Sequence, residues 1–471
     1  MPILTIVQNG VTRTVTFDGE QPLAALLDRA ETHVDKPCGG RGACKKCTVL
    51  VNGREELACR YVVRADATVV VPENRDIVSV TGADETGKAT EHMCLCLDIG
   101  TTTLALALVS LDDGATVQTV TAPNPQRKFG ADVISRIEYC AKNGAEALQS
   151  TLIGKLRELM AELLAKYGLS EIGTMYVAGN TTMLHLFFGV DCASLGVSPY
   201  TPKFLDMKTA TGAELGLAHV GEIIALPGIS AFVGADIVSG LGFVQKPQAG
   251  KWSLLIDLGT NAEIVLFNRE KYLCATAAAG PCFEGANISS GMSATAGAVN
   301  RYFADGSYSV IGDVAPAGIC ATGLVDILAA LVRDGTVEDS GYMEEDFSLT
   351  DTVRVTPADV REFQLAKSAV RSAVECLLQN GNVSCGDVET MYVAGGFSAQ
   401  LNVENASYLG LIPKELADRF VSVNNSSLRG AVKFATVGND LAGIAEKAEF
   451  IDLGADSLFS ELFFENMAFE Q

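Results

Sequence analysis

The stretch CLCLDIGTTTLALALVSL (94–111) consists of an apolar segment, a turn with an acid, a glycine and hydroxyl residues, and a second apolar segment. The same pattern returns in SLLIDLGTNAEIVLF (253–267). Each copy predicts a hairpin of two strands, since glycine tolerates the tight bend between them. One Asp-x-Gly-Thr turn is a weak signal, because Asp and Gly are common in turns for conformational reasons alone. Two copies in one chain indicate an internal duplication.

The duplication continues beyond the two turns. The sequence MYVAGN (175–180) is matched by MYVAGG (391–396). Each follows a long amphipathic pattern that predicts a helix, at 147–168 and at 359–381. Each half is therefore expected to contain a hairpin, a helix, a strand, a glycine loop and a further helix. Two α/β halves of the same design predict a cleft between them, where ligands commonly bind.

The paired turns have the chemistry of phosphate-binding loops, because their N–H and hydroxyl groups can donate to phosphoryl oxygens. The acids Asp98 and Asp257 are the candidate catalytic residues. They can hold Mg²⁺ through water, since Mg²⁺ loses its water reluctantly. We favour Asp257 for orienting an attacking water. The candidate nucleotide-binding residues are Thr101, Thr102 and Thr103 in the first turn and Gly259, Thr260 and Asn261 in the second.

Three residues outside the turns are candidates for the same site. Asp236 in FVGADIVSG opens a predicted helix, where it could bind Mg²⁺ through water or cap the helix. Asn180 follows the first MYVAG strand and either faces the cleft or caps the next helix. Glu284 in GPCFEG is a candidate cleft residue, although Glu at the end of a loop is common. His185 lies among apolar residues, which favours a core histidine over a catalyst.

Four cysteines near the N-terminus predict a metal centre. Cys38, Cys44, Cys47 and Cys59 have the spacing C-x5-C-x2-C-x11-C. This differs by one residue in the first gap from the plant-type [2Fe–2S] pattern. A four-cysteine zinc site is the alternative, but zinc ribbons usually carry two separated C-x2-C pairs and here there is one. The segments around the cysteines read as short strands and one helix, so we predict a [2Fe–2S] cluster in a small domain.

The composition excludes several classes of protein. The chain has 471 residues and a formal charge of −22, with no basic run, so we expect no nucleic-acid partner. It has no apolar run of about 18 residues, so we expect no membrane span. The N-terminus alternates like a strand and does not resemble a signal peptide. Thirteen cysteines without a secretion signal favour the reducing cytoplasm.

The paired turns resemble the phosphate loops of the superfamily of sugar kinases, heat-shock chaperones and actin. MYVAGGFS (391–398) resembles the adenosine motif of that superfamily. The resemblance covers about residues 94–449 and implies ATP with Mg²⁺ in the cleft. It places Gly395 and Gly396 against the adenine or the ribose.

The whole chain resembles the ATP-dependent reductive activators of corrinoid proteins, in their short form. The stretches that carry this resemblance are CGGRGACKKC, DIGTTT, AGNTTMLHL, FVGADIVSG, DLGTNAE, GPCFEG, QLAKSAV and NSSLRGA. The family implies one-electron transfer from the [2Fe–2S] cluster to Co(II), which gives the Co(I) needed for methyl transfer. The implied partners are a corrinoid protein of a methyltransferase system and a low-potential donor, namely a ferredoxin, a flavodoxin or a reductase. A homodimer is compatible with the sequence.

The expected fold is a multidomain α/β protein, in which a β-grasp ferredoxin-like domain precedes a duplicated actin-like (ribonuclease H-like) ATPase. The expected parts are the ferredoxin-like domain (1–80), a polar linker (81–92), ATPase subdomain I (93–249) and ATPase subdomain II with C-terminal helices (250–471). The chain departs from the family in two ways. Longer members carry an extra middle domain, for which the short linker leaves no room. Other members have a C-terminal [4Fe–4S] domain, whereas the tail here has no cysteine.

Other functions stay open at this point. One is a kinase of a small metabolite with a redox-sensing ferredoxin domain. Another is an ATP-gated iron–sulfur scaffold or binding protein. A third is a reductase activator of a dehydratase, which ranks lower because the predicted ATPase part has no suitable cysteine pair for a bridging cluster.

Overall fold

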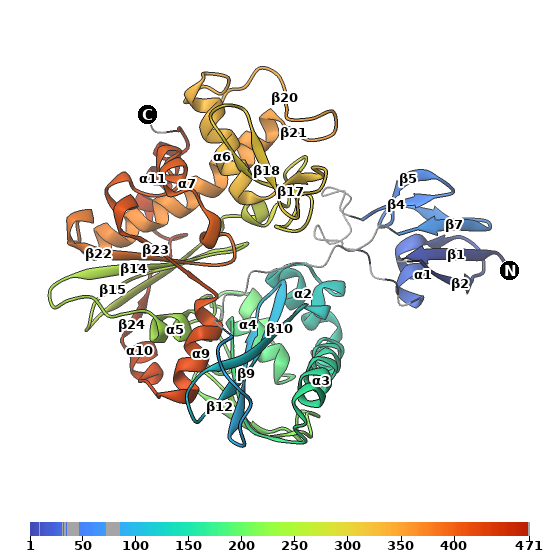
Figure 1. The fold of residues 1–471 in the computed structure, drawn as a ribbon, viewed down its shortest axis with the longest axis horizontal. Coiled ribbons are helices and arrows are strands. Elements are labelled where there is room, and N and C mark those ends of the chain that lie inside the picture. Colours follow the sequence, from blue (N-terminus) through green and yellow to red (C-terminus); the bar gives the residue numbers. More distant parts are fainter. Residues whose placement is uncertain (9, 31, 33, 35–46, 72–84, 470–471) are drawn as a thin grey trace.

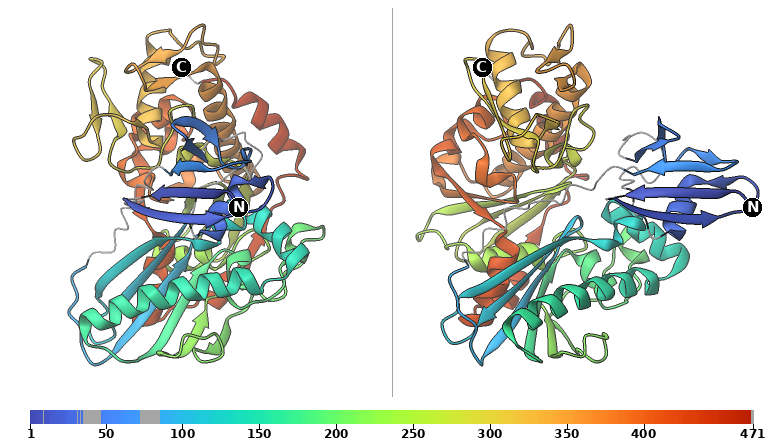
Figure 2. Two further views of the ribbon diagram at one scale, coloured as in Figure 1. Left: turned by 90° about the vertical axis from the view of Figure 1, so that its right-hand side faces the viewer. Right: turned by 45° about the vertical axis from the view of Figure 1, so that its right-hand side comes forward.

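The computed structural model describes residues 1–8, 10–30, 32, 34, 47–71 and 85–469. Cys38, Cys44 and the first part of the predicted linker lie outside these ranges. A small α/β unit near the N-terminus lies beside two larger lobes (Figure 1). The right-hand view in Figure 2 also shows the small unit to one side of the lobes. Among the described helices, none combines the length and apolar character needed to cross a membrane.

The small unit is a mixed sheet with one helix. The strand order is β2-β1-β7-β4-β5, in which β1 pairs parallel with β7 and the other pairings are antiparallel. The helix buries Leu23, Leu26 and Leu27 in the core of this unit. The bounds are β1 (Ile3–Gln8), β2 (Val11–Thr16), β3 (Gln21–Pro22), α1 (Leu23–Arg29), β4 (Thr48–Val51), β5 (Arg54–Leu57), β6 (Val62–Val63) and β7 (Ala67–Val70).

The first lobe contains a six-stranded sheet of order β10-β9-β8-β11-β13-β12. Three antiparallel strands, β8 to β10, are extended by β11 and β13, which run parallel to β8. Six of the seven residues of β8 are buried, as expected for a strand covered on both faces. The bounds are β8 (Met93–Ile99), β9 (Thr103–Ser110), β10 (Thr116–Pro123), β11 (Ile172–Gly179), β12 (Lys208–Thr211) and β13 (Val220–Ala225).

The second lobe repeats this sheet. Its order β23-β22-β14-β15-β16-β24 contains the same antiparallel trio, extended by the parallel strands β22 and β23. The sequence duplication is therefore a duplication of the sheet. The bounds are β14 (Trp252–Leu258), β15 (Ala262–Phe267), β16 (Tyr272–Ala277), β22 (Val388–Ala394), β23 (Phe420–Asn424) and β24 (Ala448–Phe450). Smaller strands are β17 (Ala298–Tyr302), β18 (Tyr308–Val310), β19 (Gly318–Ile319), β20 (Phe347–Ser348) and β21 (Arg354–Val355).

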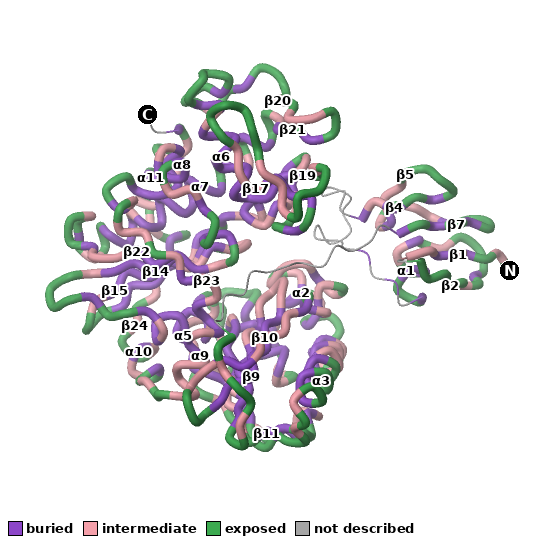
Figure 3. Tube along the Cα trace, in the orientation of Figure 1, coloured by how far each residue is buried: buried purple, intermediate pink, exposed green. Residues whose placement is uncertain are grey.

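The helices cover these sheets and form two large cores, whose buried segments are coloured purple in Figure 3. Helices α9 and α10 lie between β23 and β24 of the second sheet in sequence, but their buried residues Leu428, Ala431 and Leu441 belong to the core that contains the first sheet. The bounds in the first half are α2 (Val133–Asn143), α3 (Glu146–Tyr167), α4 (Thr181–Phe187) and α5 (Ala235–Phe243). Those in the second half are α6 (Ala321–Arg333), α7 (Pro357–Asn380), α8 (Val403–Tyr408), α9 (Ser426–Thr436), α10 (Leu441–Lys447) and α11 (Ser457–Glu465).

The described end of the predicted linker is attached to the first lobe. Glu85 forms a parallel bridge with Thr116, at the start of β10. Gly87 N donates to Thr116 O (3.0 Å), and Thr119 N donates to the Glu85 carboxylate (2.9 Å). The chain is therefore held against the edge strand from Glu85 onward.

Candidate functional site

The two Asp-x-Gly-Thr turns close in similar ways at corresponding ends of the two sheets. Gly100 N donates to Thr103 O (3.0 Å), and Gly259 N donates to Asn261 O (2.9 Å). A Cβ at Gly100 would lie 2.6 Å from Thr103 O, so this position excludes a side chain. The first turn therefore depends on glycine for close backbone approach, whereas a Cβ at Gly259 would lie no closer than 3.6 Å to its neighbours.

Glu284 connects the two turns. It ends the short helix η3 (Pro281–Glu284) in the second lobe. Thr260 Oγ1 donates to Glu284 Oε1 (2.8 Å), and Thr102 Oγ1 from the first lobe donates to Glu284 Oε2 (3.3 Å). One carboxylate thus accepts from a hydroxyl of each predicted phosphate loop, which places Glu284 between the lobes.

Asp98 is held by residues from the far end of the chain. Asn425 Nδ2 donates to Asp98 Oδ2 (2.8 Å), and Ser427 Oγ donates to Asp98 Oδ1 (2.8 Å). Burial raises the pKa of Asp98, while the hydrogen bonds from Ser427 and Asn425 act in the opposite direction. Both oxygens of the predicted acid are therefore engaged.

The acids of the site perturb one another. Burial and the charges of Asp257 and Asp98 raise the pKa of Asp236 to about 7. Burial and the charge of Asp98 raise the pKa of Asp257 to about 7 as well. Glu263 lies directly opposite Asp257 across the hairpin, and burial together with Asp236 and Asp257 raises its pKa well above the ordinary value. Such clustering of perturbed carboxylates is a mark of functional sites.

Two further predicted residues lie at helix starts beside the first turn. Asn180 Oδ1 accepts from Met183 N (2.9 Å), so it caps α4, and its Nδ2 also donates to Thr101 Oγ1 (3.1 Å). Asp236 lies in the first turn of α5, where its carboxylate accepts from Ile237 N (2.9 Å). Asn180 therefore combines the two roles that the sequence left open.

A buried arginine donates a hydrogen bond to the backbone of the first turn. Arg136 on α2 is fully buried, and its guanidinium donates to Thr101 O (2.6 Å) and Gly130 O (2.9 Å). Burial lowers its pKa to about 9, so it stays protonated near neutral pH.

The predicted adenosine loop follows β22. Gly395 has a φ of 91°, and its N–H donates to Asn424 O (2.9 Å). A Cβ at Gly395 would lie 2.6 Å from Leu258 O, at the end of the strand that carries Asp257. No described atom lies within 4 Å of a Cβ built on Gly396. The loop therefore packs against the second phosphate loop at one glycine and leaves room at the next.

Four residues of this site were missed from the sequence. Glu263, Asn425 and Ser427 lie in the stretches DLGTNAE and NSSLRGA, which carried the family resemblance without an assigned role. Arg136 had no signal in the sequence. By contrast, His185 is a buried core residue, as expected: its Nδ1 lies 2.7 Å from Thr181 O, and its Nε2 accepts from Lys203 N.

Two of the four predicted cluster ligands are described, and they lie together. Cys47 at the edge of β4 is buried, Cys59 is half-buried, and their sulfurs are 3.3 Å apart without a disulfide. Two thiolates that bind one tetrahedral metal at about 2.3 Å lie about 3.8 Å apart, so these two sulfurs are close enough to approach a single metal. Cys38 and Cys44 lie outside the described residues.

Within the described ranges, no three His, Cys, Asp or Glu side chains converge closely enough to bind a metal directly.

Comparisons with known proteins identify the family. The family model of the RACo middle region matches residues 93–245, and the model of the C-terminal domain of RACo, the ASKHA domain, matches residues 251–471. The family's middle region thus corresponds to the first lobe, and not to a domain between the linker and the first hairpin. The C-terminal ASKHA match supports the actin-like ATPase fold predicted from the paired turns.

Individual relatives agree with the family models. Corrinoid activation enzyme RamQ of Eubacterium limosum is 31% identical over 418 residues, which cover 80% of this chain and 70% of that protein. The Co(II) methylated amine-specific corrinoid protein reductase of Methanosarcina barkeri is 26% identical over 398 residues, or 76% of this chain and 72% of that protein. A solved structure of a reductive activator for corrinoid, iron-sulfur protein matches with a TM-score of 0.73 and 26% identity, over 100% of this chain and 98% of that chain. The chain therefore belongs to the family of reductive activators of corrinoid proteins.

Proposed function

We propose that this protein uses ATP to drive one-electron reduction of a corrinoid protein from Co(II) to Co(I), with a [2Fe–2S] cluster as the electron donor. The observation that carries the proposal is the convergence of two duplicated Asp-x-Gly-Thr turns on one carboxylate, Glu284, in a member of this family. A site shared by two lobes is one that a nucleotide can close, and closure is a common way to change a protein's conformation.

The proposed nucleotide lies between the lobes. Its phosphates accept from hydroxyl and backbone N–H groups of the two turns, while Glu284 keeps its bonds to Thr102 and Thr260. Gly395 and Gly396 lie against the adenine or the ribose. The proposed binding residues are Thr101, Thr102, Thr103, Asn180, Asp236, Gly259, Thr260, Asn261, Glu284, Gly395 and Gly396.

Mg²⁺ fits the acids of this site. Asp98 and Asp236 are proposed to bind its water shell, and the cation supplies neutralisation of phosphate charge. Asp257 is proposed to orient and accept a proton from the attacking water, because its pKa of about 7 suits a general base at neutral pH. Glu263 lies opposite Asp257 across the hairpin.

The small unit is the part of the protein that is proposed to receive electrons from the donor. A mixed sheet with one packed helix supports a β-grasp, ferredoxin-like fold for it. Cys38, Cys44, Cys47 and Cys59 are the proposed ligands of the [2Fe–2S] cluster, which supplies one-electron chemistry when bound. The 3.3 Å separation of Cys47 and Cys59 sulfurs supports this assignment.

The proposed electron transfer needs nucleotide because the acceptor couple has a lower potential than the cluster. Plant-type [2Fe–2S] clusters have potentials near about −400 mV, and the family resemblance implies that the Co(II)/Co(I) couple lies lower. Each further 59 mV or so is a tenfold disadvantage for one electron. ATP can offset this only by binding two conformations of the complex differently. Lobe closure provides two such conformations.

The partners proposed are a corrinoid protein of a methyltransferase system and a low-potential ferredoxin, flavodoxin or reductase. We propose the cytoplasm as the compartment, because none of the eleven described cysteines forms a disulfide. Whether the chain acts as a homodimer is a question for analytical ultracentrifugation.

The test follows the cobalt spectrum. Purified protein is mixed with a low-potential reductant and a Co(II) corrinoid protein, with and without Mg-ATP. We expect Co(I) to appear only with Mg-ATP, and only with the cluster-bearing wild type and not with Cys59→Ser. Co(I) that forms equally without ATP, or never forms, would overturn the proposal. Phosphorylation of a small metabolite in place of Co(I) formation would point to the kinase alternative.

A further inference from the structure

The start of α9 meets the first phosphate loop. The Asn425 side chain performs two tasks: its Oδ1 accepts from Leu428 N (2.8 Å) and caps the helix, and its Nδ2 donates to Asp98 Oδ2 (2.8 Å). Ser427, two residues after Asn425, donates from its Oγ to the other carboxylate oxygen, Asp98 Oδ1 (2.8 Å). The two donors lie more than 320 residues from Asp98 in sequence. They therefore form a tertiary clamp on this carboxylate.

The residue before Asn425 is tied to the adenosine loop. Asn424 ends β23 with a left-handed φ of 50°, and its carbonyl accepts from Gly395 N (2.9 Å). One peptide unit thus contacts the loop proposed for adenosine, and the next residue contacts the acid proposed for Mg²⁺. Because Asn424 and Asn425 are adjacent, a change in the distance between the adenosine loop and Asp98 must involve a movement of these two residues.

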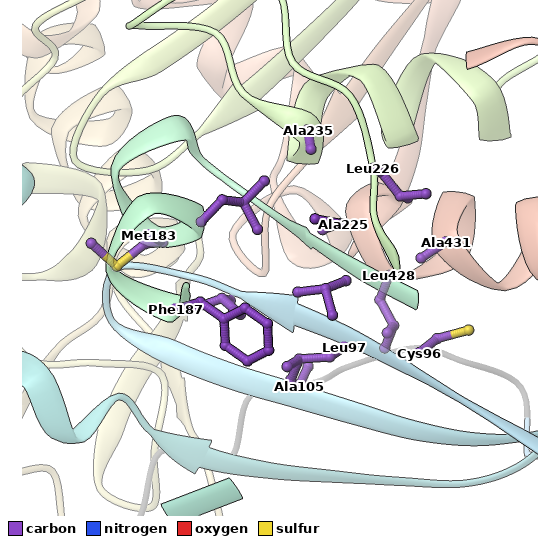
Figure 4. Close-up of a cluster of buried hydrophobic side chains, with 14 of the residues drawn as sticks. Cys96, Leu97, Ala105, Met183, Phe187, Ala225, Leu226, Ala235, Leu428 and Ala431 are labelled. Atoms are coloured by element: carbon purple, nitrogen blue, oxygen red, sulfur yellow. The ribbon is translucent and has the colours of Figure 1, made fainter. Parts of the chain in front are cut away.

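Helix α9 is fixed to the first lobe, so the clamp cannot slide freely. Leu428 and Ala431 pack beside Cys96 and Leu97 of β8 (Figure 4). Ser239 Oγ on α5 donates to Ser427 O (2.7 Å).

The crossing of α5 and α9 is also very close. A Cβ added at Gly430 would lie 1.9 Å from Ser239 O, so the two backbones touch at this glycine. Interfaces packed this tightly transmit small displacements, because they deform little. The hydroxyl of Ser427 is therefore held at a fixed position in front of Asp98.

We infer that Asn425 and Ser427 are positioning residues for Asp98, which orient its carboxylate toward the hydrated cation. The inference rests on the proposed nucleotide site. Hydrogen bonds to a charged acceptor are stronger than neutral ones, so two of them suffice to hold one rotamer of a carboxylate. Without them, Asp98 turns between orientations and binds the cation less well.

The experiment uses substitutions that keep the helix cap. Asn425→Asp keeps the oxygen that accepts from Leu428 N but places a second carboxylate against Asp98. Asn425→Ser keeps a good capping residue and removes the donor. Ser427→Ala removes the second donor, and Ser427→Thr retains the hydroxyl. Asn402→Asp is the matched control, because Asn402 caps α8, which packs on α6.

The measurements are the Mg²⁺ concentration for half-maximal ATP hydrolysis and the calorimetric affinity for ADP with and without Mg²⁺. We expect about a tenfold higher Mg²⁺ requirement for Asn425→Asp and a smaller rise for Asn425→Ser and Ser427→Ala. Ser427→Thr and Asn402→Asp should behave like wild type. The affinity for ADP without Mg²⁺ should not change, which a general loss of structure could not produce.

The outcomes separate the two proposals. If wild type binds and hydrolyses Mg-ATP but the Asn425 and Ser427 variants match it, the positioning role is wrong and the nucleotide site stands. If the variants lose ADP affinity equally with and without Mg²⁺, the residues act on structure and the positioning role is also wrong. If wild type binds no nucleotide, the proposed function fails and this inference fails with it.

Discussion

Asp257 and Glu263 lie directly opposite each other across the β14–β15 hairpin. Residues so paired in an antiparallel ladder share one face of the sheet, and like charges there are destabilising. The first lobe has the neutral residue Ala105 opposite Asp98. The duplicated hairpins have therefore diverged at this position, and the second lobe carries an additional acid whose repulsion a bound cation can offset.

Glu263→Gln should separate stability from function. Without Mg²⁺ at about pH 8, removal of this carboxylate relieves repulsion, so we expect the melting temperature to rise by about 2–4 °C. ATP hydrolysis should fall, because a charge near the cation is lost. Differential scanning fluorimetry and a phosphate-release assay measure the two effects. Glu222→Gln, an exposed acid on β13, is the control and should change neither. A variant that is both less stable and fully active would contradict the pairing argument.

The pH dependence of stability follows from Asp236 and Asp257. Both have pKa values of about 7 in the folded protein against 3.8 ordinarily, so folding is favoured by proton uptake. Their contribution is complete below about pH 4 and is lost as the pH rises through about 7. We therefore expect the Mg²⁺-free protein to melt higher at about pH 6 than at about pH 8.

The same argument predicts how the effect of Mg²⁺ on the melting temperature depends on pH. The cation should raise the melting temperature more at about pH 8, where the acids are ionised, than at about pH 6. The variant Asp236→Asn/Asp257→Asn should lose most of both dependences. An equal effect of Mg²⁺ at both pH values would show that these acids do not meet the cation.

Glu284→Ala should speed nucleotide release. The wild-type carboxylate joins Thr102 of one lobe to Thr260 of the other, and its removal lowers the cost of separating the lobes. We expect dissociation of a fluorescent ADP analogue to accelerate about threefold to tenfold in stopped-flow measurements. Glu362→Ala is the control, since Glu362 contacts Asn287 of the neighbouring loop and neither threonine. An unchanged rate would remove Glu284 from the lobe contact.

Cys59→Ser should abolish the [2Fe–2S] cluster. Its sulfur lies beside that of Cys47, and a serine oxygen is a poor ligand for iron in such clusters. After anaerobic reconstitution, we expect loss of the visible absorption and of the reduced-state EPR signal, with Mg-nucleotide binding retained. Cys385→Ser changes a half-buried thiol elsewhere and should keep the cluster. Full absorption in Cys59→Ser would require a different fourth ligand.

The duplicated fold was predictable because its signals are local and repeated. Apolar strands around Asp98 and Asp257 gave both hairpins, and the amphipathic patterns before 175 and 391 gave α3 and α7, whose structural bounds differ by one or two residues from those expected. The order of strands in the two sheets could not be read from one copy, but repetition of hairpin, helix and strand made their similarity predictable.

The site was only partly predictable, because its remaining contacts are made between distant parts of the chain. The turns stood out by their composition and repetition, whereas Glu284 was a weaker candidate because Glu is common at the end of a loop. Asn425 and Ser427 did not, since polar residues at the start of a helix are expected as caps. Their second role depends on α9 crossing back to the first lobe, which no periodicity shows. Glu263 occupies a strand position whose register with Asp257 depends on the length of the turn.

The attachment of Glu85 to β10 sets the point at which the chain from the small unit joins the first lobe. Its fixed end lies on the edge strand of the first lobe, beside Thr116, and not at the first residue of β8. A rotation of the first lobe would therefore move the point at which the small unit is attached. In mechanical terms, the first lobe would act as a lever arm, because the proposed nucleotide-driven rotation would shift the point on β10 to which Glu85 is attached.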